Sequence, residues 1–250
     1  VQVRQDQVGY FGRRTHDFIP ISECQIAENE INEVIKNFPT MKTLLPKEVE
    51  RAEIFLDLSN QVKVRDTSEP GEDIGFAQVN RDQNRNLIDL VLNFLKDRDF
   101  DIVYDLYGGA GNFAFPINKL FPKARILSVE LNQASVLLGR ETAKSSKIPS
   151  RVLSFFLSDV AAFLRRTEIS NRSLIVLDPP RSGCSPEVID ILKNSVASGI
   201  AYVSCNPSSL ARDLELLTIQ GQYRIVSVQP IDMFPQTDHI ESLVCMVPKV

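Results

Sequence analysis

The sequence predicts an α/β fold in which a mostly parallel sheet carries helices on both faces. Three observations lead to this prediction. Short apolar runs alternate with helical segments from about residue 81 onward, which is typical of such a sheet. A glycine-rich turn follows the first run. A Ser-Cys-Asn-Pro turn follows the run that ends at residue 204, at the edge where ligands of open α/β sheets bind.

A separate segment precedes this alternation. The first 21 residues alternate weakly in polarity and turn at glycines, which predicts two or three short antiparallel strands. Residues 26–38 place apolar side chains on one helical face, and residues 52–65 predict another strand pair. The polar run 66–73 is the best boundary. We therefore expect a small α+β subdomain over 1–73 and a second domain over 74–250.

The second domain begins with an amphipathic helix at 81–96. Five apolar runs then alternate with helical segments, and two further strands complete the pattern. The seven predicted strands are Ile102–Leu106, Ile126–Val129, Val152–Phe156, Leu174–Leu177, Ile200–Ser204, Tyr223–Val228 and Ser242–Val247.

Composition limits the class of protein. The 250 residues are 43% hydrophobic and 24% charged, and no apolar run approaches the ~18 residues of a membrane span. We therefore expect no membrane partner and a cytoplasmic location. The net charge is −4, with the acidic excess in the first third. A local basic patch for nucleic acid stays open, and the sequence does not indicate an oligomeric state.

The cysteines indicate a reduced protein without a bound metal. Cys24, Cys184, Cys205 and Cys245 form no C-x-x-C pair, and the two histidines lie far apart. Because no complete zinc or iron–sulfur ligand set is present, we predict no metal site. Cys205 differs from the other three, since it stands directly between an apolar strand and Asn-Pro. It is therefore either a thiol at the sheet edge that attacks a ligand or a small buried hydrophobe.

The glycine-rich turn D-L-Y-G-G-A-G-N-F at 105–113 predicts a nucleotide-type site. A tight βα connection is the alternative. Glu130, at the end of the second strand, suits a pair of ribose hydroxyls. The turn is not G-x-G-x-x-G and no second mononucleotide half follows, so the predicted ligand is adenosine without pyrophosphate, as in S-adenosylmethionine. Asp159 would lie near the adenine. Asp178 would lie at the sheet edge, because Pro179-Pro180 delays the next helix.

At this point the sequence resembles the S-adenosylmethionine-dependent RNA 5-methyluridine methyltransferases, which modify tRNA or 23S rRNA. The resemblance implies a Rossmann-like class I methyltransferase fold with a seven-stranded mostly parallel sheet. We expect no counterpart of the N-terminal TRAM domain that many members have. Only Cys24 matches the four-cysteine iron–sulfur cluster of some members, so no cluster is expected. The matching motifs, in the family's order over 75–250, are G-F-A-Q-V-N, D-L-Y-G-G-A-G-N-F, L-D-P-P-R-S-G, Y-V-S-C-N-P-S-S-L-A-R-D and D-M-F-P-Q-T-D-H-I-E-S.

The resemblance implies a role for each matched residue. Cys205 would be the nucleophile and Glu241 the base that removes the carbon-5 proton. Arg181 and Arg212 either hold phosphates or form surface salt bridges, and Phe234 either stacks on a base or packs in the core, with the core favoured. The residues expected around S-adenosylmethionine are Gln78, Tyr107, Gly109, Asn112, Glu130, Asp159 and Asp178. Those expected at the RNA are Asn80, Arg181, Arg212 and Phe234.

The predicted mechanism is covalent. Carbon-5 of uracil is a poor nucleophile, but addition of a thiolate to carbon-6 makes it an enolate carbon that accepts a methyl group. The thiolate requires a lowered pKa or an arranged proton transfer. A base with its pKa raised toward neutrality then removes the carbon-5 proton. The uracil must leave any helical stack to meet both groups.

Two alternatives stay open. An RNA 5-methylcytosine methyltransferase would carry a cysteine after the proline of the fourth-strand motif, where this chain has Arg181, with Cys184 three residues later. The second alternative is a non-catalytic RNA-binding protein with a methyltransferase fold. The acidic charge and the expected lack of a TRAM domain favour it. The presence of both Cys205 and Glu241 argues against it.

Overall fold

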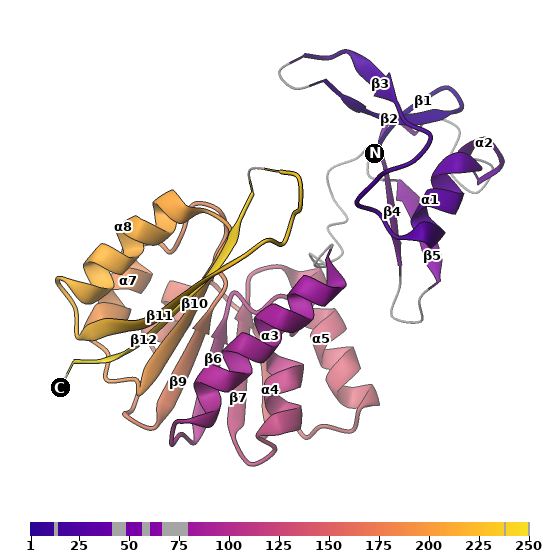
Figure 1. Ribbon diagram of the computed structural model, residues 1–250. Coiled ribbons are helices and arrows are strands. Elements are labelled where there is room, and N and C mark those ends of the chain that lie inside the picture. Colours follow the sequence, from indigo (N-terminus) through magenta and orange to yellow (C-terminus); the bar gives the residue numbers. More distant parts are fainter. Residues whose placement is uncertain (13–14, 42–48, 57–60, 67–79, 238, 250) are drawn as a thin grey trace. The chain divides into compact units, whose positions relative to one another are not determined.

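The computed structural model describes residues 1–12, 15–41, 49–56, 61–66, 80–237 and 239–249 (Figure 1). The chain divides into two compact units, Val1–Asp73 and Ile74–Val250. Most of the polar run predicted as a boundary lies outside the described residues, as does Gln78. Among the residues that the structure describes, no helix is long and apolar enough to cross a membrane.

The N-terminal unit is a small α+β assembly, as predicted. Its antiparallel sheet has the order β1-β2-β3, and a separate hairpin joins β4 to β5. Val3, Val8, Ile35, Phe38 and Ala52 form its core. The elements are β1 (Gln2–Arg4), β2 (Gln7–Phe11), β3 (Phe18–Pro20), α1 (Asn29–Lys36), α2 (Phe38–Met41), β4 (Ala52–Leu56) and β5 (Val62–Asp66).

The helix predicted at 26–38 is shorter in the structure. It begins at Asn29 because the Asn32 side chain binds the main chain of Cys24 and Ala27, which holds the preceding residues in a turn. It ends at Lys36. The Asn37 side chain donates to the carbonyl of Glu33 at 2.9 Å and closes the last turn.

The C-terminal unit is built on a seven-stranded sheet of order β11-β12-β10-β9-β6-β7-β8. The five strands from β10 to β8 are parallel, and β12 runs antiparallel to both β10 and β11. The predicted fold is therefore confirmed. The strands are β6 (Ile102–Leu106), β7 (Arg125–Glu130), β8 (Leu153–Leu157), β9 (Ser173–Leu177), β10 (Gly199–Ser204), β11 (Tyr223–Ile231) and β12 (Glu241–Pro248).

Helices cover both faces of this sheet (Figure 1). One face packs against α3 (Arg81–Lys96), α4 (Ala114–Leu120) and α5 (Gln133–Ser145). The other packs against α6 (Val160–Leu164), α7 (Pro186–Lys193) and α8 (Pro207–Thr218). Because the central strands are buried on both faces, β9 and β10 read as continuous apolar runs rather than alternating ones.

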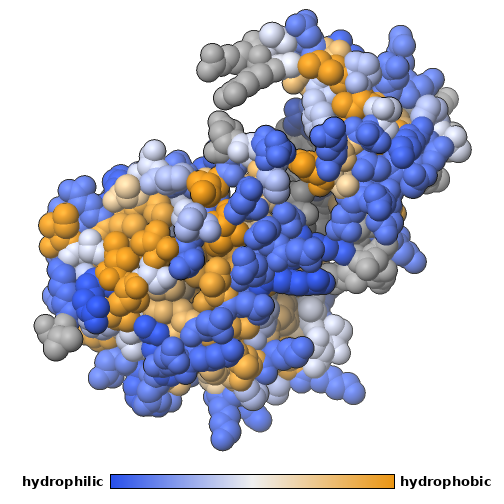
Figure 2. Space-filling view, in the orientation of Figure 1, coloured by the Kyte–Doolittle hydropathy of each residue, from blue (hydrophilic) through white to orange (hydrophobic). Residues whose placement is uncertain are grey.

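The outer strand β11 extends three residues beyond the predicted 223–228, to Ile231. Pro230 is tolerated there because β11 is an edge strand and needs no second ladder partner. The extension lengthens the pairing with β12 as far as Ile231 opposite Glu241. Hydrophobic side chains gather over β11 and β12 in Figure 2, and Val226 and Val228 are exposed.

The strand order reverses beside β6, which has β7 on one side and β9 on the other although β9 follows much later in the chain. In open α/β sheets such a reversal leaves a crevice at the carboxyl ends of the strands, because the connecting helices leave on opposite faces. The residues that follow β6, β9 and β10 are therefore brought to one edge of the sheet.

Candidate functional site

Cys205 lies at the carboxyl end of β10 and is half-buried. The next residue, Asn206, begins α8 by accepting the Ser208 N–H at 3.0 Å, and Pro207 occupies the first helical turn. Asparagine is favoured before a helix because its side chain accepts a backbone N–H that has no partner in the first turn. Proline is favoured in that turn because it has no N–H that needs a partner. This combination ends the strand abruptly and leaves the thiol at the sheet edge.

The antiparallel register brings Glu241 beside this thiol. Ser204 is opposite Ser242 across β10 and β12. Cys205 follows Ser204 and Glu241 precedes Ser242, so the two residues lie at the same end of the strand pair, and the carboxyl acts electrostatically on the thiol. The Glu241 side chain is almost fully buried, at 4% exposure. Burial raises its pKa to about 7, which suits a group that takes up and releases a proton near neutral pH.

Asp178 is the third group at this edge. It follows β9, and its main-chain N–H donates to the carbonyl of Leu106 at 3.2 Å, which ties together the ends of β9 and β6. It caps no helix, since Ser185 caps α7. Burial raises the pKa of Asp178 well above its ordinary value, and the nearby carboxyl of Glu241 raises it further.

The charges around Cys205 oppose its ionisation. Burial raises the pKa of the thiol, and the carboxyls of Glu241 and Asp178 add to that effect. Arg181 acts in the opposite direction and lowers it. A thiolate at this position therefore depends on a cation or on protonation of the neighbouring acids.

The glycine turn after β6 forms an open cradle. Gly109 and Gly111 have left-handed φ angles of +55° and +103°, and Tyr107 has one of +63°. A Cβ at Gly108 would lie 2.2 Å from the Ser128 hydroxyl, so the turn packs against the end of β7. A Cβ at Gly109 would meet nothing within 4 Å. The exposed backbone at Gly109 therefore leaves room for a ligand to approach closely.

Glu130 closes one side of this cradle. Its carboxylate accepts the Gly109 N–H at 3.1 Å and the N–H groups of Leu131 and Asn132 at 2.7 Å each. These contacts fix the carboxylate at the end of β7, facing the glycine turn. Each carboxylate oxygen has two lone pairs. Because Oε1 accepts from both Leu131 and Asn132, one lone pair on Oε2 is left for a ribose hydroxyl. The turn and Glu130 together fit an adenosyl ligand.

Asp105 belongs to this cradle, although the sequence reasoning did not assign it a role. It is fully buried in β6, and its Oδ2 accepts the Ser128 hydroxyl at 3.1 Å. Its Oδ1 has no hydrogen-bond partner among the described residues. Burial raises its pKa to about 7. The available signal was a carboxylate inside an otherwise apolar strand, directly before the glycine turn.

Three predicted site residues have structural partners. Asn112 exchanges two hydrogen bonds with Asn84 of α3, at 2.9 and 3.1 Å, which fastens the glycine turn to that helix. Asp159 is exposed and caps α6 by accepting the Ala162 N–H at 2.9 Å. Asn80 caps α3 in the same way. Each of these side chains therefore already has a hydrogen-bond partner within the protein.

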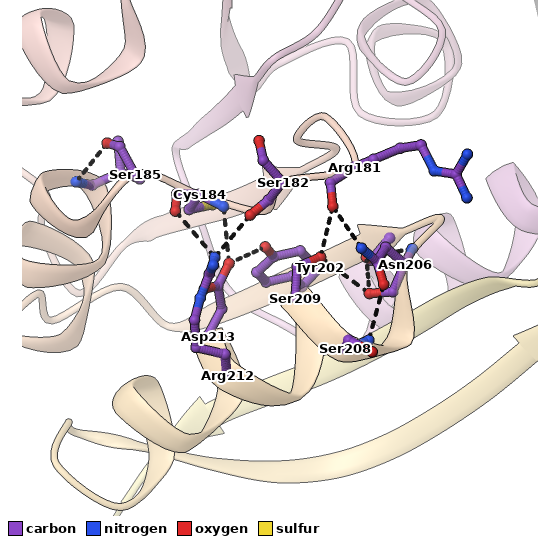
Figure 3. A network of polar contacts seen from close by, with 12 residues as sticks. Arg181, Ser182, Cys184, Ser185, Tyr202, Asn206, Ser208, Ser209, Arg212 and Asp213 are labelled. Carbon is purple, nitrogen blue, oxygen red and sulfur yellow. Dashed lines mark hydrogen bonds and ion pairs between the residues drawn. The ribbon is translucent and has the colours of Figure 1, made fainter.

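The two arginines differ in their partners. Arg212 binds the buried carboxylate of Asp213 and the carbonyl of Ser182, at 2.7 and 2.9 Å. Asp213 also accepts the Tyr202 hydroxyl at 2.6 Å. Figure 3 shows the Arg181 side chain extending away from this cluster, and its guanidinium contacts the His239 ring nitrogen Nδ1 at 3.2 Å.

Phe234 and Cys184 pack inward. Phe234 is partly buried against the core and meets the His239 ring edge-on, with 6.1 Å between centroids. The Cys184 N–H donates to Asp213 at 2.8 Å. Burial raises the pKa of the Cys184 thiol to about 12. Such a thiol is a poor nucleophile, which weakens the 5-methylcytosine alternative.

Comparison with known proteins places the chain in a family. Residues 46–249 match the model of the tRNA (uracil-5-)-methyltransferase family. An uncharacterized RNA methyltransferase of Bdellovibrio bacteriovorus is 36% identical over 96% of this chain and 61% of its own length. The 23S rRNA (uracil(1939)-C(5))-methyltransferase of Pseudomonas putida is 28% identical over 97% of this chain and 64% of its own. The chain thus spans less than two thirds of these relatives.

Solved structures agree on the fold. The tRNA (uracil-54, C5)-methyltransferase of Pyrococcus abyssi, in complex with S-adenosyl-L-homocysteine, superposes with a TM-score of 0.59 at 24% identity, over 78% of this chain and 44% of its own. A magnesium protoporphyrin IX methyltransferase of Synechocystis with bound S-adenosylmethionine has a TM-score of 0.52 at 13% identity, over 70% and 87%. The family consists of S-adenosylmethionine-dependent RNA-modifying enzymes of class 2.1.1, as the predicted cofactor and enzyme class require. The chain belongs to the tRNA (uracil-5-)-methyltransferase family.

Proposed function

We propose that this chain methylates carbon-5 of a uridine in rRNA or tRNA, with Cys205 as the nucleophile and Glu241 as the base. One observation carries the proposal. The register of β10 and β12 brings a half-buried thiol beside a buried carboxyl whose pKa is raised to about 7. A nucleophile and a proton acceptor side by side are what addition and elimination at neighbouring ring carbons require.

The residues act in sequence on the uracil. The Cys205 thiolate adds to carbon-6, and carbon-5 becomes nucleophilic and takes the methyl group. S-adenosylmethionine supplies that methyl group. The Glu241 carboxylate then removes the proton from carbon-5, and the electron pair of that C–H bond expels the thiolate from carbon-6. Asp178 lies beside both groups. Its raised pKa favours the protonated carboxyl, which can donate a hydrogen bond to the uracil edge.

The cofactor takes the cradle after β6. Glu130 faces the open backbone at Gly109 and would accept a hydrogen bond from a ribose hydroxyl. Tyr107 begins the turn with a left-handed φ, and its contact with the cofactor stays a prediction. Asn112 holds the turn against α3, and its contact with the cofactor stays a prediction. The predicted contact of Gln78 falls outside the described residues and stays a prediction.

The substrate is RNA with a uridine that leaves its stack, since both reacting groups lie at the sheet edge and one of them is buried. Relatives named for 23S rRNA and a structural neighbour named for tRNA support both substrate classes. Arg212 already binds the carboxylate of Asp213, which makes it the less available of the two arginines for an RNA phosphate.

The test uses tRNA and rRNA fragments that carry 5-fluorouridine, together with S-adenosylmethionine. Fluorine cannot leave as a proton, so the enzyme is expected to stall as a covalent protein–RNA adduct on denaturing gels. Cys205→Ala should abolish the adduct, whereas Cys24→Ala, which alters a half-buried thiol of the other unit, should leave it intact. An adduct that persists in Cys205→Ala contradicts the assigned nucleophile.

A further inference from the structure

The Cys205 thiol lies among acidic groups, so its ionisation depends on a nearby positive charge. The groups that act on the thiol are Glu241 from β12, Asp178 after β9, and Arg181 from the loop that follows Asp178. Both acids disfavour a thiolate, and so does burial. Among the described residues, Arg181 is the one cation that favours it. Its side chain therefore bears directly on whether the nucleophile forms.

The charge of Arg181 is not neutralised by a carboxylate of the described residues. Its guanidinium contacts Nδ1 of His239 at 3.2 Å. A guanidinium can only donate, so the imidazole nitrogen accepts and leaves the positive charge in place. His239 lies two residues before Glu241, so this contact holds the guanidinium near the start of β12, from where its charge acts on the Cys205 thiol. Arg212, by contrast, is paired with the buried Asp213.

A clamp built from α8 holds the main chain of Arg181. The side chain of Asn206 donates to the Arg181 carbonyl at 2.8 Å, and the Ser209 hydroxyl donates to it at 3.0 Å (Figure 3). Asn206 directly follows Cys205, so the turn that carries Cys205 is hydrogen-bonded to the loop that carries Arg181. Ser209 also donates to the carbonyl of Asn206, at 3.2 Å. The main chain of Arg181 is thereby held against the residue that directly follows Cys205.

A second set of contacts holds the other end of the same loop. Gly183 has a left-handed φ of +79°, and the carbonyl of Ser182 accepts a hydrogen bond from Arg212 at 2.9 Å. The Cys184 N–H donates to Asp213, also on α8. Loop 181–184 is thus bound to one helix at both ends, which restricts the directions available to the Arg181 side chain.

We propose that Arg181 stabilises the thiolate of Cys205, and that Asn206 and Ser209 are positioning residues that hold Arg181 there through its main-chain carbonyl. The inference rests on the proposed function only in that Cys205 acts as a thiolate. It assigns separate tasks to the two arginines: Arg181 activates the nucleophile, and Arg212 neutralises Asp213 and stabilises the loop.

The experiment measures alkylation of the free protein by iodoacetamide between pH 6 and pH 9.5, with peptides quantified by mass spectrometry. Neither RNA nor cofactor is added, so the result is readable whether or not methyl transfer is observed. Cys24 serves as a half-buried reference thiol in the same sample. Cys184 and Cys245, each 4% exposed, are expected to stay unlabelled and report that the C-terminal unit is folded.

Arg181→Gln is expected to slow alkylation of Cys205 about three- to tenfold at pH 7.5 and to displace its pH curve upward, with Cys24 unchanged. Arg181→Lys keeps the charge and should stay near the unmodified rate. Ser209→Ala should slow the alkylation of Cys205 by a smaller factor. Arg165→Gln removes a surface charge paired with Glu187 and should change nothing at Cys205.

Two results would overturn the inference. One is a pH dependence of Cys205 alkylation that is unchanged in Arg181→Gln, with the buried cysteines still protected. The other is an equal loss in Arg181→Gln and Arg181→Lys, because a charge effect must survive the exchange of one cation for another. Either result leaves the covalent mechanism to be judged separately by adduct formation with 5-fluorouridine RNA.

Discussion

Replacement of Glu241 by glutamine should stabilise the folded protein while it blocks turnover. The carboxyl is 4% exposed, and burial raises its pKa from 4.5 to about 7. The folded state therefore binds the proton more tightly than the unfolded state does. The contribution of this carboxyl to the free energy of unfolding is largest below pH 4.5, decreases as the pH rises from 4.5 to about 7, and stays at its lower value above that. Glutamine is neutral throughout and avoids that loss.

The change in the free energy of unfolding follows from the size of the pKa shift of Glu241. A rise from 4.5 to about 7 corresponds to about 3 kcal/mol of lost stability at pH 8. Glu241→Gln should recover about this amount at pH 8 and little of it at pH 5. In a unit of this size, 1 kcal/mol shifts the melting temperature by about 2–4 °C. The expected gain at pH 8 is therefore about 6–12 °C.

The assay is thermal unfolding of both proteins at pH 5 and pH 8, followed by circular dichroism. Glu187→Gln is the control, since Glu187 is a surface carboxylate paired with Arg165 and should show no comparable difference between the two pH values. In parallel, methylation by Glu241→Gln should be about 10²–10⁴-fold slower, because the base that releases the product is lost. RNA should remain covalently attached to Cys205.

An equal change in melting temperature at both pH values would show that the Glu241 carboxyl is ionised in the folded protein. The argument for a base poised near neutrality would then fail. A Glu241→Gln protein that methylates and releases RNA at the normal rate would refute the assigned role directly, whatever its stability.

The other predictions concern the loop and the cradle. Gly183→Ala places a Cβ 2.6 Å from both Arg212 and Asp213 at a φ of +79°, so urea unfolding should show a loss of about 2–4 kcal/mol. Tyr202→Phe removes the 2.6 Å hydrogen bond to the buried Asp213 and should cost about 1–3 kcal/mol in the same measurement. Gly109→Val fills the open side of the cradle at a φ of +55°, and calorimetry should show at least about tenfold weaker binding of S-adenosylmethionine.

The succession of strands and helices along the chain, and the places of Asp178 and Cys205 directly after β9 and β10, could be predicted from the sequence because they depend on local patterns. The apolar runs of β9 and β10 are buried on both faces and leave little ambiguity. The turns that follow them are marked by proline and glycine. The family resemblance added Glu241, which no local pattern singles out.

Contacts between distant segments could not be predicted. Asn112 was expected at the cofactor, but its amide is matched by Asn84, 28 residues away. Asp159 reads equally as a ligand or as a cap until the helix after it is seen. The choice between Arg181 and Arg212 depends on the buried Asp213, whose role as an acceptor appears only when α8 packs against loop 181–184.

The placement of β12 has a consequence for activity. This strand inserts between β10 and β11, although it follows both in the chain, and it carries Glu241 at its first position. Cys205 directly follows β10 and reaches the sheet edge with that strand, whereas Glu241 comes beside it only through the pairing of β12 with β10. A chain in which β12 is unpaired therefore lacks the Cys205–Glu241 pair on which the proposed function depends. Loss of this one antiparallel pairing is expected to abolish methylation even where the five parallel strands are intact.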